Sequence, residues 1–105
     1  MKQYLNSEQT AELIELGFEK PKSVVEGALY SDIYFAYSIG ELIEMLPKEI
    51  NNDILPDTLG TYIDHNGMWA AGYSCVLGEQ YSTCRTELID ALYDMVVKLK
   101  EEGVI

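Results

Sequence analysis

The sequence predicts a small α+β fold in which helices pack on one face of a small antiparallel sheet. Three local patterns lead to this prediction. Apolar residues recur at helical spacing over residues 83–102, which is typical of an amphipathic helix. Residues 38–41 form a helix-capping box in front of an apolar run. Asn66-Gly67 separates two β-prone runs and strongly indicates a hairpin. With a short first helix, the predicted order is helix, helix, β-hairpin, helix.

Length and composition indicate one compact α+β domain over residues 1–105. The chain has 105 residues, of which 48% are apolar, so it can bury one core but hardly two. No run of about 18 apolar residues occurs, and polar residues follow Met1 too soon for a signal peptide. We therefore expect a cytoplasmic protein with no membrane partner.

The charge balance argues against direct nucleic-acid binding. Eighteen acidic residues outnumber seven basic ones, which gives a formal net charge of −11. A domain with so few Lys and Arg residues cannot neutralise many phosphates. No basic recognition helix follows the first predicted helix either.

Capping signals place the first two helices. The first is expected from about Ser7 to Leu16, with Asn6 or Ser7 as its cap and Gly17 as its stop. The second begins after Ser38, whose hydroxyl pairs with Glu41 in the capping box, and ends before Pro47. Between them, residues 20–35 show no clean period and are interpreted as irregular, with at most a short helical turn or strand.

The hairpin is expected to join residues 59–65 to residues 68–76 through a two-residue turn at Asn66-Gly67. In that register His65 faces Met68 and Tyr62 faces Ala71. One face of the hairpin would then carry Tyr62, Trp69, Ala71, Tyr73 and Cys75. The other face would carry Leu59, Ile63, Met68, Ala70 and Val76, and the sequence leaves open which face is buried.

The last helix, from about Thr83 to Glu102, has two distinct sides. Its apolar stripe consists of Leu88, Ile89, Leu92, Met95, Val96 and Leu99. Its opposite side, expected to face solvent, carries Glu87, Asp90, Asp94, Lys98 and Glu101. Asp94 and Lys98 are four residues apart, so we expect a weak ion pair between them.

Residues 38–47, the Trp-bearing hairpin and residues 87–105 together resemble a set of small uncharacterised proteins from phage-like and mobile elements of gut bacteria. The similarity covers about the last two thirds of the chain, and a weaker similarity extends over residues 5–17. The resemblance implies a phage-like accessory protein and no particular chemistry. Where the family typically has β-branched or aromatic residues after the Trp, this chain has Ala70-Ala71-Gly72, which is expected to weaken the sheet.

No catalytic, cofactor or metal site is predicted. His65, Cys75 and Cys84 lack the close pairing of structural zinc ligands. A thiol nucleophile with His65 as its base is disfavoured because Cys75 and His65 are expected on opposite hairpin faces. A Cys75–Cys84 disulfide is sterically conceivable, but free thiols are expected in a reducing compartment. We therefore predict a protein that is not an enzyme.

Tyrosines and acidic residues supply the candidate interaction patch. Its members are Tyr30, Tyr34, Tyr62, Trp69, Tyr73, Glu87, Asp90 and Asp94. The aromatic residues are expected to belong first of all to the core, and the alternative is a contact patch, because aromatic residues are enriched in protein interfaces. The resulting prediction is a small accessory protein that associates with an unknown protein or with itself. The alternative is an acidic decoy that occupies the nucleic-acid-binding surface of a host protein.

Overall fold

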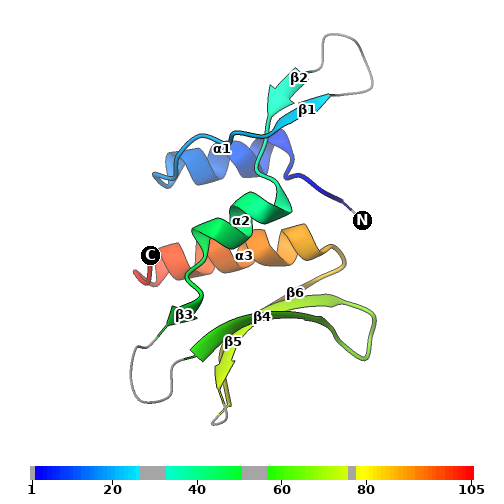
Figure 1. The fold of residues 1–105 in the computed structure, drawn as a ribbon, viewed down its shortest axis with the longest axis vertical. Coiled ribbons are helices and arrows are strands. Elements are labelled where there is room, and N and C mark those ends of the chain that lie inside the picture. Colours follow the sequence, from blue (N-terminus) through cyan, green and yellow to red (C-terminus); the bar gives the residue numbers. More distant parts are fainter. Residues whose placement is uncertain (1, 27–32, 51–56, 76–77) are drawn as a thin grey trace.

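The computed structural model describes residues 2–26, 33–50, 57–75 and 78–105. Three helices and six strands follow one another along this part of the chain (Figure 1). Their bounds are α1 (Ser7–Glu15), β1 (Val24–Glu26), β2 (Ile33–Phe35), α2 (Ile39–Met45), β3 (Glu49–Ile50), β4 (Asp57–Ile63), β5 (Trp69–Cys75), β6 (Gly78–Arg85) and α3 (Leu88–Glu101).

The main sheet is antiparallel, and its strands lie in the order β3, β4, β5, β6. Helix α3 lies along one face of this sheet, while the opposite face carries no helix (Figure 1). Helix α2 packs beside α3 (Figure 1). Helix α1 is joined to α3 by hydrogen bonds of Gln9 with Asp90 and of Glu12 with Tyr93, and the separate β1–β2 hairpin lies next to α1 (Figure 1). The predicted α+β class, with helices on one face of a small antiparallel sheet, is confirmed.

The core lies between α3, α2, α1 and the covered face of the sheet. Its largest fully buried side chains are Tyr73, Leu5, Leu13, Leu42, Ile89, Leu92, Met95, Leu99 and Val96. Tyr73 is the one aromatic group among them, and its hydroxyl donates a 2.6 Å hydrogen bond to the carbonyl of Pro47. Burial raises the pKa of Tyr73 to about 12, so this hydroxyl remains a donor.

Both predicted capping signals are present. The Asn6 side chain accepts from the Gln9 amide, and the Gln9 side chain accepts from the Asn6 amide, so α1 begins with a reciprocal box. Gly17 then takes φ +100°, and the Phe18 amide donates to the Leu13 carbonyl, which ends the helix as predicted. The box before α2 pairs Ser38 with Glu41 in the same manner.

The predicted hairpin register is wrong by one residue. The observed pairs are Ile63 with Trp69 and Tyr62 with Ala70, because the turn contains three residues rather than two. Asp64 causes the change: its carboxylate accepts hydrogen bonds from the amides of Asn66 and Met68, and its carbonyl accepts from Gly67. This shift moves Tyr62 to the face opposite Trp69 and Tyr73.

The last helix begins later than predicted. Residues 78–85 form strand β6, which pairs with β5, and α3 starts only at Leu88. Thr83 belongs to the strand, where its hydroxyl donates a 2.7 Å hydrogen bond to the carbonyl of Ala91 in α3. Pairing with β5 therefore prevails over the helical continuation that the apolar spacing indicated.

The segment interpreted as irregular contains a short antiparallel hairpin. Val24 of β1 pairs with Phe35 of β2, and the Ala36 amide donates to the carbonyl of Ser23. Three residues per strand give too little periodicity for detection in a sequence. Strand β3 has only two residues and was not predicted, for the same reason.

Candidate interaction surface

The aromatic residues of the predicted patch do not form one surface. Tyr73 is 0% exposed and belongs to the core, so it cannot contact a partner. Tyr62 is 48% exposed on the sheet face without a helix, while Trp69 is half-buried on the other face. Tyr34 lies on β2 opposite Val25. Tyr30 lies outside the described residues.

The acidic residues of the predicted patch are engaged within the protein instead of facing solvent. Glu87 accepts a hydrogen bond from the Lys2 amide, and Asp90 lies 3.2 Å from the Lys2 ammonium. Asp94 is held by Arg85 at 2.9 Å, so Arg85 replaces the expected partner Lys98. These contacts hold the N-terminal segment and β6 against α3. The three carboxylates therefore have a structural role.

The pKa of Asp90 reflects this engagement. Burial would raise it, but hydrogen bonds from Gln9 and Lys2, together with the Lys2 charge, hold it below its usual value. The carboxylate is therefore ionised at neutral pH, and its Oδ1 accepts hydrogen bonds from both Lys2 and Gln9.

A different surface gathers exposed apolar side chains from three elements. Ile14 of α1, Val24 of β1 and Phe35 of β2 are 36%, 50% and 59% exposed. We call these three residues the Phe35 patch. Ile14 and Phe35 line a pocket of about 220 Å³ together with Thr10, Lys20 and Pro21.

Local geometry explains why these residues meet. The left-handed Gly17 ends α1, and the buried Pro21 lies beside the helix as the chain turns towards β1. Pairing of Val24 with Phe35 then puts both side chains on the same face of the β1–β2 hairpin. The Phe35 patch was missed from the sequence because residues 20–35 were interpreted as irregular. Ile14 was one indication of the patch in the sequence: it is an apolar residue next to Leu13, and it lies outside the core.

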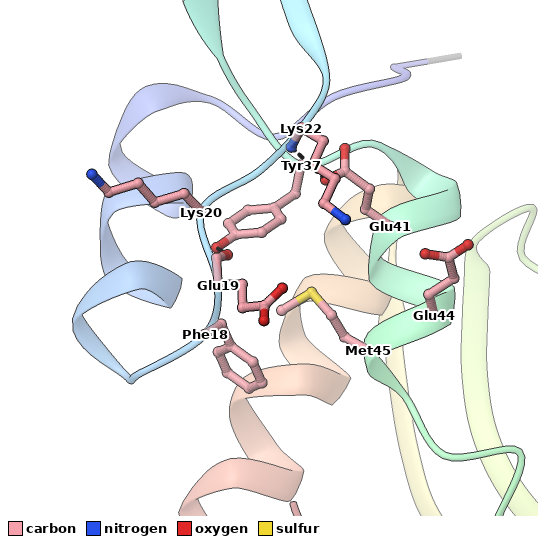
Figure 2. Close-up of a pocket in the computed structure, with 8 residues that line it drawn as sticks. All are labelled: Phe18, Glu19, Lys20, Lys22, Tyr37, Glu41, Glu44 and Met45. Carbon is pink, nitrogen blue, oxygen red and sulfur yellow. Dashed lines mark hydrogen bonds between the residues drawn. The ribbon is translucent and has the colours of Figure 1, made fainter.

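A second pocket, of about 280 Å³, lies between residues 18–22 and α2 (Figure 2). Glu41 joins the two sides of this pocket. Its carboxylate accepts hydrogen bonds from the Ser23 hydroxyl and from the amides of Lys22 and Ser38. The Tyr37 hydroxyl donates to the carbonyl of Glu19 (Figure 2). Phe18 and Met45 supply the apolar part of the lining.

The polar groups of this second pocket serve the fold. Burial raises the pKa of Tyr37, and the neighbouring charges of Glu41 and Glu19 raise it further, so its hydroxyl acts as a donor and not as a base. The Lys20 side chain extends away from Glu41 and Met45 (Figure 2). Glu41 thus fastens the segment that carries the Phe35 patch to the start of α2.

Cys84 and Asp64 form a third cluster, near the hairpin turn. The free thiol of Cys84 donates to the Asp64 carboxylate at 3.4 Å. Partial desolvation, followed by the contact with Asp64, raises the pKa of this thiol, which makes it a poorer nucleophile. Within the described residues, no three His, Cys, Asp or Glu side chains gather as metal ligands. The Cys75 side chain lies outside the description.

The described helices include none that is long and apolar enough to cross a membrane. No protein-family model matches the chain, and neither a curated protein nor a solved structure shows significant similarity to it. The resemblance to small proteins of phage-like elements therefore stays a prediction.

Proposed function

We propose that this protein acts without catalysis, by associating with another protein or with a second copy of itself, and that the Phe35 patch is its contact surface. The observation that carries the proposal is the 59% exposure of Phe35 beside two further exposed apolar side chains. Single exposed apolar residues are normal on a protein surface, but a cluster beside a pocket is typical of an interaction site.

The geometry of the patch suits an anchor-type contact. Phe35 stands at the centre, paired with Val24 and sharing a pocket with Ile14. Large aromatic side chains beside a small pocket are the groups that contribute most to protein interfaces. Glu41 fastens the neighbouring segment through its bonds to Ser23 and Lys22, so the patch is held in place before binding.

The acidic decoy has less support. Glu87, Asp90 and Asp94 are bound to Lys2 or Arg85, so they do not form a row of free carboxylates that could imitate nucleic-acid phosphates. We also place the protein in the cytoplasm, because the free thiol of Cys84 suits a reducing compartment. The proposal of a phage-like accessory role rests on the sequence resemblance alone.

Comparison of two variants tests the proposal. Phe35→Ser removes the centre of the patch, while Ile63→Ser removes an apolar side chain of similar exposure, 57%, at the distant β4–β5 hairpin. Immobilised wild type and both variants would be compared for quantitative capture of host proteins, and light scattering would report self-association. We expect Phe35→Ser alone to lose the captured host proteins or, where the Phe35 patch joins two copies, to form a smaller assembly than wild type. Equal behaviour of all three proteins, with matched melting temperatures, would refute the Phe35 patch.

A further inference from the structure

Strand β6 is the outer strand of the main sheet. It has eight residues, Gly78–Arg85, and it pairs with β5 along one side only. Within the described chain, no strand pairs with its other side. Every second backbone N–H and C=O group of an outer strand points away from the sheet, and such a row can pair with another strand.

The second half of β6 lacks the usual protection of an outer strand. Natural sheet edges carry Lys, Pro or a bulge that prevents further pairing. In this protein the register shift lies opposite Tyr73 and Ser74, near the Glu79 end. Residues 81–85 contain neither Lys nor Pro, and Ser82 and Cys84 are exposed.

Charge makes this edge suitable for a second copy of the chain. A net charge of −11 opposes contact between copies over most of the surface. Beside residues 81–85, however, charges of both signs lie close together: Arg85 is paired with Asp94 of α3, and Lys98 of α3 lies over the Tyr81 ring, 5.8 Å from its centre. This edge therefore lacks the excess of negative charge that the chain carries as a whole.

We propose that two copies form a dimer by antiparallel pairing of their β6 strands about a two-fold axis at Thr83. In this register Tyr81 of one copy lies opposite Arg85 of the other, and Ser82 lies opposite Cys84. The two-fold axis is perpendicular to the sheet, so both α3 helices lie on the same face. Lys98 of each copy then approaches Asp94 of the other, which makes the contact self-complementary.

This interface is separate from the Phe35 patch, so the two proposals fail independently. Phe35→Ser should leave the β6 dimer unchanged, and disruption of the dimer should leave binding at the Phe35 patch intact.

Light scattering and sedimentation of the full chain over a wide concentration range test for the dimer. Lys98→Glu places a negative charge opposite Asp94 of the second copy, so we expect the dissociation constant to rise about tenfold. Lys48→Glu makes the same charge change at an exposed site remote from β6 and should have a much smaller effect. A monomer at all concentrations, or equal weakening by both variants, would overturn the proposal.

Cysteine cross-linking tests the register. In a Cys75→Ser background, Ser82→Cys should form a disulfide with Cys84 of the second copy. Directly opposite Cβ atoms lie about 4.5–5.5 Å apart, and a small shift of the two strands brings them to the roughly 3.5–4.5 Å that a disulfide spans. A disulfide between Gln80→Cys and Cys84 of the second copy would instead indicate a two-fold axis at Ser82. Ser74→Cys, on the inner strand β5, is the control. A link between Ser82→Cys and Cys84, found by mass spectrometry, supports the register. Linking of Gln80→Cys instead, or equal linking of Ser74→Cys, would overturn it.

Discussion

The hydroxyl groups of Thr10 and Thr83 differ in whether they have a hydrogen-bond partner. This difference gives them opposite effects on stability. The Thr83 hydroxyl donates to the carbonyl of Ala91 and so joins β6 to α3. The Thr10 hydroxyl is buried on α1, and it has no hydrogen-bond partner among the described residues. A buried polar atom without a partner costs the free energy of its lost hydration, whereas a satisfied one contributes modestly to stability.

Replacement of each threonine by valine should therefore shift stability in opposite directions. We expect Thr10→Val to raise the free energy of unfolding by about 1 kcal/mol, and Thr83→Val to lower it by about 1 kcal/mol. Both changes preserve shape and β-branching, so each serves as the control for the other. Urea denaturation measures the two values, and a loss of stability in Thr10→Val would show that its hydroxyl has a partner in solution.

Glu41 links two elements through one carboxylate. It completes the capping box of α2 with Ser38, and it accepts hydrogen bonds from Lys22 and Ser23 in the segment before β1. Burial would raise its pKa, but the hydrogen bonds from Ser23, Lys22 and Ser38 together hold the pKa below its usual value.

Glu41→Ala should lower the free energy of unfolding by about 1–2 kcal/mol at pH 7, since it removes a cap and the contacts to residues 22–23. Because the folded-state pKa is lowered, this contribution is present above the unfolded-state pKa and disappears as pH falls through the folded-state value. The difference between wild type and variant should shrink below about pH 4. Urea titrations at several pH values measure it, with the exposed Glu44→Ala as control. A difference that persists unchanged at low pH would contradict this account.

Gly72 shows why small residues occupy the middle of β5. A Cβ atom at this position would lie 2.6 Å from the Glu79 carboxylate and 3.1 Å from the Tyr81 carbonyl oxygen. Its cross-strand neighbour Gly60, in β4, has no other atom within 4 Å of the same position. The absence of a side chain at Gly72 thus lets the Glu79 side chain lie over the sheet, where the Tyr62 hydroxyl donates to it.

These two glycines form a matched pair for substitution. Gly72→Ala should lower the free energy of unfolding by about 1–2 kcal/mol through crowding at the Tyr81 carbonyl. Gly60→Ala should be neutral or stabilising by up to about 0.5–1 kcal/mol, because it removes chain entropy without a clash. Denaturant midpoints measure both. Equal effects would mean that the sheet relaxes around Gly72 at no cost.

Net charge acts on the molecule as a whole. The protein carries a formal charge of −11, and only some carboxylates are paired, such as Asp90 with Lys2 and Asp94 with Arg85. The remaining repulsion between like charges opposes the folded state, and dissolved salt screens it.

Added salt should therefore stabilise the protein. An increase from about 10 mM to about 200 mM NaCl should raise the melting temperature by a few degrees. Glu15→Lys, at an exposed position, reduces the net charge and should flatten this dependence. Thermal melts followed by circular dichroism measure both slopes. A melting temperature that falls with salt would mean that the ion pairs at Asp90 and Asp94 outweigh the general repulsion.

The parts of the fold that could be predicted depend on neighbours in sequence. The boxes at Asn6 and Ser38, the stop at Gly17 and the stripe of α3 all use contacts within about five residues. Asp64 shows the limit of this approach: its carboxylate adds one residue to the turn, and this change moved every side chain of one strand to the other face.

Local sequence alone determined both ends of α1 and α2, the position of the hairpin turn and the acidic character of the surface, because each depends on residue type and near neighbours. Tertiary structure decided the rest. Strand β6 exists because β5 offers it a partner, the carboxylates of α3 are occupied because Lys2 and Arg85 reach them, and the Phe35 patch exists because three separate segments converge. These features depend on contacts between residues far apart in the chain, whose energies no local pattern records.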